Sequence, residues 1–378
     1  MYRNRRAARM TSVVVVSIAA FGVIAAAGSA AAEPNAELAF PSGIAVSSAA
    51  CPDPSPLVSV QSMRPNGSRV AAAADGLAKI YTYRTAAGLV QQTMPPVGWS
   101  ALRATDAERE MYGFPTKPTD PSQLATWTEA MSITTYLPPA GFCTSTVSSA
   151  VSHTATNPYW AGGMTVNGSA TTNTYTSTAA QWVEPSFVNS GCPGTTAQSG
   201  MSIWSGLGGW NSDKLIQAGT DNAGLSTLNT SSYFYELING SVDTREVYPG
   251  GTASLPSGHE AYITVSYNTS SHYASFMFED LTARSELLPV SVSNASQYYE
   301  GTTADFVSEA PAGGPALNGR FYLRKPTSAL SYTYAVTNGS GVSHFSSWRI
   351  NEVNANGTMQ TSSFDGINAW KNTWSRCG

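Results

Sequence analysis

The chain has 378 residues, of which 42% are hydrophobic and only 12% are charged, and its formal net charge at pH 7 is −4. From Pro158 to the end it carries nine Lys or Arg against fifteen Asp or Glu, which excludes a nucleic-acid groove and a polybasic membrane patch. The length allows about two domains and a sizeable core. With few carboxylates available to lose salt bridges on acidification, the composition is compatible with an acidic working environment.

The first 32 residues are typical of a secretory signal peptide. Four arginines among the first nine residues precede an apolar run over 13–27, and small residues follow as far as Ala32. A transmembrane anchor is the alternative, but a cleavage-type pattern of small residues follows the apolar run instead of basic stop-transfer residues. We therefore expect a secreted, extracellular product with no membrane partner after signal cleavage.

Four cysteines in an exported chain favour two disulfides over reactive thiols or metal ligands. Three pairings are possible, and position suggests Cys51 with Cys143 and Cys192 with Cys377. None of the cysteine spacings resembles a zinc site, and the four histidines are scattered. The sequence therefore predicts neither a metal nor a cofactor.

Residues 33–150 are predicted to form a propeptide or N-terminal region that is partly helical. The Ala, Ser and Pro-rich segment to about Asn66 is interpreted as extended or mobile. Thr105 and Glu108 form a possible capping box for a helix that stops at 113–115.

A second helix is indicated after Asp120, which can cap it, with Pro121 at the first helical position. Composition then changes to Ser, Thr and Ala between Cys143 and Pro158. We place the domain boundary there, so that the second domain covers residues 151–378.

The sequence pattern of this second domain predicts strands and turns. Alternation predicts strands over 262–267, 273–278 and 330–336, and in the last one Leu330, Tyr332, Tyr334 and Val336 would share one face. Asn-Gly pairs at 239–240, 338–339 and 356–357 predict tight hairpins. Many short strands in about 220 residues favour an all-β fold, a two-sheet antiparallel sandwich.

The sequence contains neither of two familiar catalytic motifs. The strand-to-helix elbow of a serine hydrolase, with Gly on both sides of x-Ser-x, is absent. His259-Glu260 begins like a zinc-protease helix, but Ile263 stands where the second histidine belongs. His259 is therefore interpreted as a surface turn residue.

The segment 202–220 contains a lone amide, Gln217, in an apolar strand pattern. Gly206, Gly208 and Gly209 allow a sharp turn and leave room for a ligand. An unpaired buried amide costs about 1–3 kcal/mol. Either a structural hydrogen bond satisfies Gln217 or a site uses it.

Carboxylates supply the remaining candidates. Around Glu309, alternation puts Asp305, Val307 and Glu309 on one face of a strand and Phe306 on the other. Taken alone, Glu309 and Glu236 are more often surface residues. Tryptophans such as Trp204 and Trp182 are more often core residues than subsites.

Six short motifs in order, over about the last 220 residues, resemble the glutamic peptidases, the eqolisin family: Pro158–Gly162, Gln181–Pro185, Trp204–Gly208, Leu215–Gly219, Phe234–Glu236 and Ala304–Glu309. The helical segment 102–115 also resembles the leader regions of exported bacterial relatives. The resemblance implies a concanavalin-like, jelly-roll-type β-sandwich preceded by a small partly helical region, secretion as a precursor, and peptide hydrolysis at acidic pH.

Carried over residue by residue, the resemblance makes Gln217 and Glu309 the catalytic dyad in the concave sheet. Substrate contacts would come from Trp204, Phe234 and Glu236, with Phe234 standing where the family has tryptophan. Three further positions differ from the family: Gly208 replaces an acidic residue, and Asp305 and Phe306 replace Glu and Trp in the final motif.

The dyad chemistry is coherent. Ionised Glu309 takes a proton from a water held between the two side chains, the water attacks the scissile carbonyl, and the Gln217 amide donates to the oxyanion. Because Glu309 must be ionised, activity is expected around or below about pH 5 and fails where Glu309 is fully protonated.

The sequence thus predicts a secreted, monomeric acid endopeptidase that acts on protein or peptide substrates without a nucleic-acid partner. One alternative is a non-catalytic sandwich that binds peptide or carbohydrate. The other is a glycosidase that uses two carboxylates, for example Glu236 and Glu309.

Overall fold

The computed structural model describes residues 54–70, 76–85, 88–144, 156–157, 159–166, 174–188, 199–210, 212–222, 229–240, 242–248, 254–311, 322–341, 347–354, 357–364 and 370–377. The expected signal peptide, Cys51 and Cys192 lie outside these ranges. Cys143 and Cys377 are not free thiols, and the proposed pairing stays a prediction. Within the described ranges, no helix has the length and apolarity needed to span a bilayer.

The N-terminal part of the described chain contains β1 (Leu57–Met63), β2 (Arg69–Val70), β3 (Ala78–Thr85), β4 (Gly88–Met94), α1 (Asp106–Tyr112), η1 (Pro121–Gln123), α2 (Leu124–Ala130) and β5 (Cys143–Thr144). The rest contains β6 (Thr156–Asn157), β7 (Trp160–Val166), β8 (Ser177–Val183), β9 (Phe187–Val188), β10 (Ser199–Gly200), β11 (Ser202–Gly208), β12 (Lys214–Asp221), β13 (Thr230–Asn239), β14 (Val242–Val247), β15 (Ser254–Pro256), β16 (Glu260–Tyr267), β17 (Ala274–Asp280), β18 (Ser285–Val292), η3 (Ala295–Tyr298), β19 (Thr303–Glu309), β20 (Tyr322–Leu323), β21 (Lys325–Pro326), β22 (Leu330–Thr337), β23 (Ser340–Gly341), β24 (Ser347–Asn354), β25 (Gly357–Phe364) and β26 (Trp370–Trp374).

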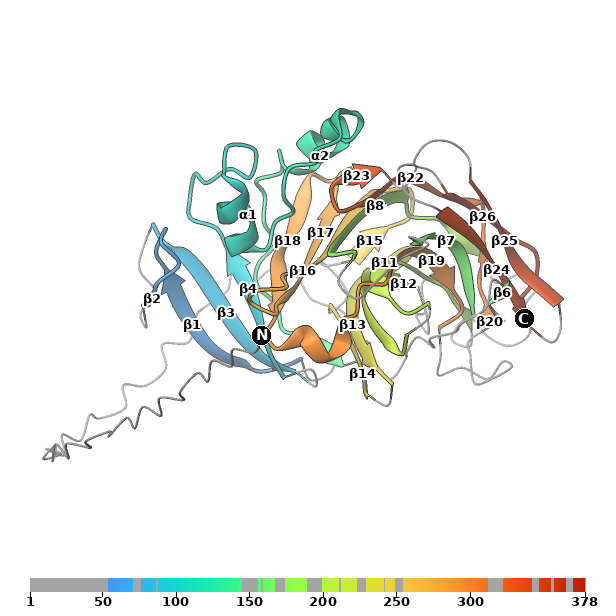
Figure 1. Cartoon of the computed structure of the whole chain (residues 1–378), viewed down its shortest axis with the longest axis horizontal. Helices are drawn as coiled ribbons and strands as arrows, with labels where there is room; N and C mark the ends of the chain where they lie inside the picture. The colour runs from blue at the N-terminus through green and yellow to red at the C-terminus, as the bar shows by residue number, and fades with distance from the viewer. Residues whose placement is uncertain are drawn as a thin grey trace, which may run out of the picture. The chain divides into compact units, whose positions relative to one another are not determined.

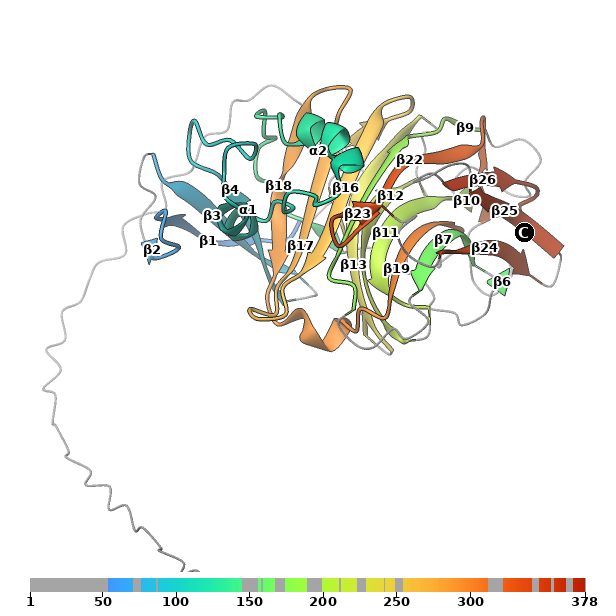
Figure 2. The same ribbon diagram turned by 45° about the horizontal axis from the view of Figure 1, so that its top comes forward.

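Most strands belong to two largely antiparallel sheets, which confirms the predicted sandwich (Figure 1). Sheet A has the order β2-β1-β3-β4-β18-β17-β16-β8-β22-β26-β25-β24. Sheet B has the order β5-β14-β13-β12-β11-β19-β7-β24. Strand β24 pairs with β7 through its first half and with β25 through its second half. It therefore connects the two sheets, beside β7 and β25 in Figure 2.

Apolar residues from the inner faces of both sheets form the main core. Its aromatic side chains make direct ring contacts: Tyr235 of sheet B stacks on Phe276 of sheet A with ring centroids 4.9 Å apart, and Trp182 meets Tyr332 at 5.6 Å. A second apolar cluster lies on the opposite face of sheet B and contains Trp204. We call that opposite face the site face.

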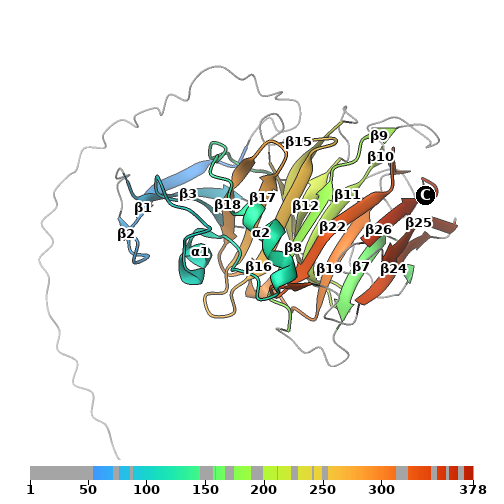
Figure 3. The same ribbon diagram turned by 90° about the horizontal axis from the view of Figure 1, so that it is seen from above.

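The N-terminal region extends sheet A rather than forming a separate helical unit. Strand β4 pairs with β18, so β1–β4 add to the edge of sheet A, and β5 pairs with the edge strand β14 of sheet B. Helices α1 and α2 lie over the outer face of sheet A (Figure 3), where Phe114 and Trp127 share an apolar cluster with Tyr262. The helices were predicted from the sequence, whereas these strands were not.

Both helix starts follow the predicted capping chemistry. The Thr105 hydroxyl accepts from the Glu108 amide while the Glu108 carboxylate accepts from the Thr105 amide, and Gly113 ends α1 in a left-handed conformation with φ 85°. Asp120 caps the next segment through the Ser122 amide, although its first turn is a 3-10 helix before α2.

Two of the three Asn-Gly turns are confirmed. Gly240, with φ 54°, joins β13 to β14, and Asn338 and Gly339, with φ 49° and 73°, join β22 to β23. Asn356 lies outside the described residues.

The expectation that four even-numbered residues of β22 share one face is wrong. A register shift lies between Tyr332 and Tyr334 in the pairing with β8. Leu330 and Tyr332 therefore pack in the main core, whereas Tyr334 and Val336 pack under the helices. One extra residue at a bulge reverses the alternation beyond it.

Glu184 is buried between the sheets and accepts hydrogen bonds from Trp182 Nε1, Thr220 Oγ1 and Ser231 Oγ. Burial raises the pKa of this carboxyl from 4.5 to about 7. The three hydrogen-bond donors oppose this shift, whereas the nearby charge of Asp221 adds to it. The folded state therefore holds a proton that the unfolded chain has already released at mildly acidic pH.

Because the pKa of Glu184 is raised in the folded state, the contribution of Glu184 to stability is fully present below about pH 4.5 and is lost as the pH rises to about 7. In the Glu184→Gln variant, we expect the decrease in the free energy of unfolding over this pH interval to be about 3 kcal/mol smaller than in the wild type. Urea denaturation at several pH values measures it, with Glu260→Gln as the control, because Glu260 is a partly exposed carboxyl whose register partner is Val183, next to Glu184. Equal pH slopes in wild type and Glu184→Gln would contradict this assignment.

Candidate active site

One transverse row of sheet B carries the amide and a carboxyl that face each other across a glycine. Gly206 of β11 is the register partner of Gln217 in β12 and of Asp305 in β19. Register partners project to the same side of a sheet, and two strand spacings separate the outer Cα atoms by about 10 Å. Gly206 has no side chain, and a Cβ placed there would lie 3.0 Å from Gln217 Cβ and 3.1 Å from Leu215 Cδ1, so the neighbouring side chains pack closely over this position.

Glu309 lies on the same face but in a different row. Its register partners are Ser202 on β11 and Trp160 on β7. It is four residues from Asp305 along β19, or about 13 Å. The sheet therefore brings Asp305, and not Glu309, opposite Gln217.

Asp305 is fully buried, and its two oxygens differ. Thr303 Oγ1 donates to Oδ2 at 2.9 Å, while Oδ1 has no hydrogen-bond partner among the described residues. Burial raises the pKa of Asp305 well above its usual range, against the smaller opposing effect of the Thr303 hydroxyl. This carboxyl is held with one acceptor position unused by the described residues.

Gln217 is oriented by its other neighbour. Glu236 of β13 is its register partner on the side away from Gly206, and Gln217 Nε2 donates a hydrogen bond to Glu236 Oε2. Glu236 is buried as well. The amide of Gln217 is thus oriented by the carboxylate of Glu236.

A buried arginine balances the carboxylates. Arg245 lies 3.5 Å from Glu236 and 3.1 Å from Asp221, and it donates to Ser202 Oγ at 2.9 Å. Its guanidinium also sits 3.7 Å from the ring centroid of Phe234. Burial opposes this charge, yet Asp221, Glu236 and Glu309 together hold the pKa of Arg245 above its usual value.

Aromatic residues border the polar row. Phe234 and Trp204 flank Gly219, the register partner of both, and Trp204 meets Trp160 edge-on at 5.0 Å. A Cβ on Gly219 would lie 2.0 Å from the Ile203 carbonyl oxygen, so only glycine fits there. Gly208 has φ 90°, which explains why this position carries no acidic side chain.

The site face therefore gathers all five residues singled out from the sequence: Gln217, Glu309, Trp204, Phe234 and Glu236. Each is 0% exposed. Sequence reasoning did not assign roles to Asp305, Asp221 and Arg245. Alternation placed Asp305 on the same face as Glu309. Asp221 lies four residues after Gln217, an even number, so the same rule places it on the face of Gln217. Both carboxyls could therefore have been found from the sequence.

His259 lies at the predicted turn, but it has a partner that the sequence did not reveal. Its Nδ1 is 2.7 Å from Asp280 Oδ2. Both residues line a small pocket of about 190 Å³. In the described part of the chain, no group of three or more His, Cys, Asp or Glu side chains is arranged to hold a metal.

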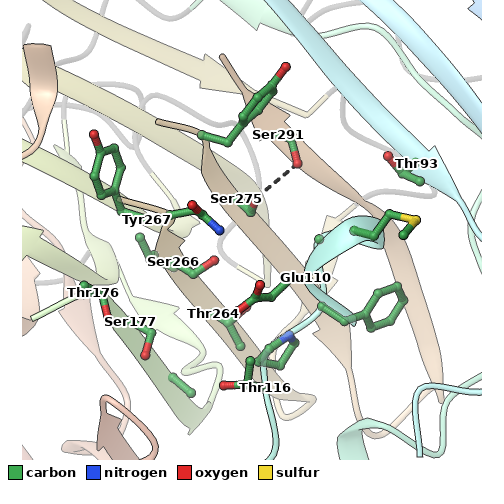
Figure 4. A pocket seen from close by; sticks show the side chains of 18 of the residues that line it. Thr93, Glu110, Thr116, Thr176, Ser177, Thr264, Ser266, Tyr267, Ser275 and Ser291 are labelled. Carbon is green, nitrogen blue, oxygen red and sulfur yellow. Dashed lines mark hydrogen bonds between the residues drawn. The ribbon is translucent and has the colours of Figure 1, made fainter. Parts of the chain in front are cut away.

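A larger cavity of about 500 Å³ lies between α1 and the outer face of sheet A. Figure 4 shows its floor of hydroxyl side chains, with Ser275 and Ser291 hydrogen-bonded to each other at 3.1 Å and Glu110 at one wall. None of the site-face residues lines this cavity. Its size alone does not make it the catalytic centre, because it lacks the amide and buried carboxyls found in sheet B.

No protein-family model and no curated protein matches the chain. Among solved structures, two crystal structures of scytalidoglutamic peptidase, each with a transition-state analogue, are 19% identical and give TM-scores of 0.44 and 0.45. SCP-B, a member of the eqolisin peptidases in complex with the tripeptide Ala-Ile-His, is 17% identical with a TM-score of 0.43. Each match covers 58% of this chain and 98% of the other. At these scores the function has to be argued from the residues of this chain.

Replacing Arg245 by Met should destabilise the fold strongly, because it leaves Asp221 and Glu236 buried without their cation. We expect the free energy of unfolding at pH 7 to fall by about 3–5 kcal/mol, measured by urea denaturation. Arg349→Met, which removes an exposed arginine, is the matched control. A loss below about 1 kcal/mol for Arg245→Met would contradict a charge-balancing role.

Proposed function

We propose that the protein is an acid peptide hydrolase whose reaction takes place over Gly206, between Gln217 and Asp305. The observation that carries this proposal is their common row on the site face. Hydrolysis of a peptide bond needs a base for water and a donor for the oxyanion. A carboxyl and an amide oriented by Glu236, on either side of a glycine, supply both.

In this mechanism, ionised Asp305 accepts a proton from a water held over Gly206. The water attacks the scissile carbonyl carbon, and the Gln217 Nε2 hydrogen that is not donated to Glu236 stabilises the developing oxyanion. Protonated Asp305 then transfers its proton to the leaving amine as the C–N bond breaks. The carboxyl returns to its ionised state, so the cycle needs no other proton carrier.

The buried position of Asp305 influences the pH range of this reaction. Because burial raises its pKa, the ionised form accumulates only as the pH rises through that raised value, and the acid limb of activity follows this ionisation. On the alkaline side, folded carboxyls such as Glu184 lose protons that stabilise the fold. We therefore propose a maximum on the acid side of neutrality.

The neighbouring residues have supporting roles in this proposal. Glu236, kept balanced by Arg245, orients the Gln217 amide, while Trp204 and Phe234 provide apolar surface beside the reacting groups. Engagement by Gln217 and Arg245 makes Glu236 a poor second carboxylate for glycoside cleavage. Secretion and action on protein or peptide substrates as a monomer belong to the same proposal, and Glu309 is the alternative base.

The test compares Asp305→Asn, Glu309→Gln and Gln217→Ala for cleavage of a denatured protein between pH 3 and pH 6, a range chosen to span carboxyl titration. We expect Asp305→Asn to lose about 10²–10⁴-fold in kcat and Gln217→Ala about 10²–10³-fold. Glu309→Gln and the exposed-carboxyl control Asp213→Asn should retain activity within about tenfold.

Thermal melting of each variant at the assay pH separates loss of activity from loss of fold. Retained cleavage by Asp305→Asn together with inactive Glu309→Gln would assign the base to Glu309. Unchanged cleavage by both Asp305→Asn and Gln217→Ala would overturn the proposal.

A further inference from the structure

Two carboxyl groups lie opposite each other on the outer face of sheet A, in the sheet that does not carry the site residues. Glu279 of β17 and Glu286 of β18 are direct register partners, and they are 0% and 1% exposed. None of their four carboxyl oxygens has a hydrogen-bond partner among the described residues. Two such groups cannot both be charged at low cost, because each loses hydration and repels the other.

The N-terminal region covers this pair. Residues 132–137, which follow α2 and which we call the strap, run along β18 at Glu286. The Leu137 amide donates to the Glu286 carbonyl at 2.7 Å, and the Glu286 amide donates to the Thr135 carbonyl at 3.0 Å. Figures 1 and 3 show α2 above the neighbouring strands. The strap thus binds to the backbone of a residue whose side chain is one of the two buried acids.

The charged and titratable groups around the pair do not neutralise two negative charges. Arg284, in the turn between β17 and β18, is exposed and donates to Ser132 Oγ of the strap at 2.9 Å. The other groups that act on the pair are a carboxyl and three phenols: Glu129 of α2, Tyr136 of the strap, Tyr262 of β16 and Tyr233 of β13. Glu129 adds a further negative charge, so the surroundings favour protonated carboxyls.

A metal ion is a poor occupant for this position. Calcium in proteins takes six to eight oxygen ligands and magnesium demands near-octahedral geometry. The register provides two carboxyl groups in an apolar setting, and no cluster of three ligating residues occurs in the described part of the chain. Protons are the simpler counter-charge.

We propose that the Glu279 and Glu286 pair makes docking of the strap dependent on pH: the strap is held while the pair keeps its protons and is released as the pair ionises. The inference is independent of the proposed peptidase activity, since it concerns the outer face of sheet A. It assigns the N-terminal region the role of a brace that is tightest in acid.

The direction follows from the burial of the pair. Burial, and for Glu286 also the neighbouring Glu279, raises the pKa of these carboxyls well above the ordinary value. When the strap undocks, water reaches the carboxyls and their pKa values return toward normal. The docked state therefore binds more protons between the ordinary and the raised pKa, and docking weakens as the pH rises through that interval.

Hydrogen exchange in the full chain tests the proposal. The protection factor of the Leu137 amide, corrected for the intrinsic exchange rate, should fall by at least about tenfold between about pH 4 and pH 8 in the wild type. Glu279→Gln and Glu286→Gln keep side-chain size but remove one charge each, and their double variant should show protection that is independent of pH. Glu110→Gln, an exposed carboxyl on α1, is the control and should behave as wild type.

Amides of β12 and β13 distinguish local release from global unfolding, because they should stay protected at both pH values. A second measurement, trypsin cleavage after Arg284 and in the N-terminal region, should become faster at the higher pH in wild type but not in the double variant. Protection of Leu137 that is flat with pH in wild type, or that falls equally in the double variant, would overturn the proposal.

Discussion

The buried charge of Arg245 is the interaction on which the site face depends. Glu236 and Asp221 come from two neighbouring strands and project into a region closed to water, where two unbalanced carboxylates would be strongly destabilising. One guanidinium reaches both, and it rests on the Phe234 ring. With Glu236 balanced, its carboxylate is available to fix the Gln217 amide, so the orientation of the proposed oxyanion donor depends on Arg245, which lies four strands from Asp305.

The fold treats its other buried acids differently. Glu184 is satisfied by three hydrogen-bond donors but no cation, Asp305 has one donor, and Glu279 faces Glu286 with no donor among the described residues. In each case burial raises the pKa of the carboxyl, so the packed state favours the protonated form, and Asp305 acts as the proposed base only after it releases its proton. Acid-denaturation of typical proteins comes from protonating carboxylates that are paired in the native state. Here most of the buried acids with shifted pKa values have the opposite effect, because their protonated forms stabilise the folded state.

Local features of the fold were predictable from sequence, and features that depend on strand pairing were not. Thr105 with Glu108, and Asn338 with Gly339, act over three residues or fewer, and their capping box and turn appear as expected. The bulge beside Tyr334 depends on the register between β22 and β8, so simple alternation assigned its face wrongly. Strands β1–β4 were missed because they are stabilised by pairing with one another and with the edge of sheet A.

The same limit explains the choice between Asp305 and Glu309. Alternation identifies the face of β19 that each side chain occupies, and every second residue satisfies it equally. Which of them meets Gln217 depends on how β11 is aligned with both neighbours, and that alignment puts Asp305 across Gly206 and Glu309 across Ser202. Two strand spacings, about 10 Å, separate the Cα atoms of Asp305 and Gln217, so a base and an amide donor at these two positions would act on a water between them, as hydrolysis requires.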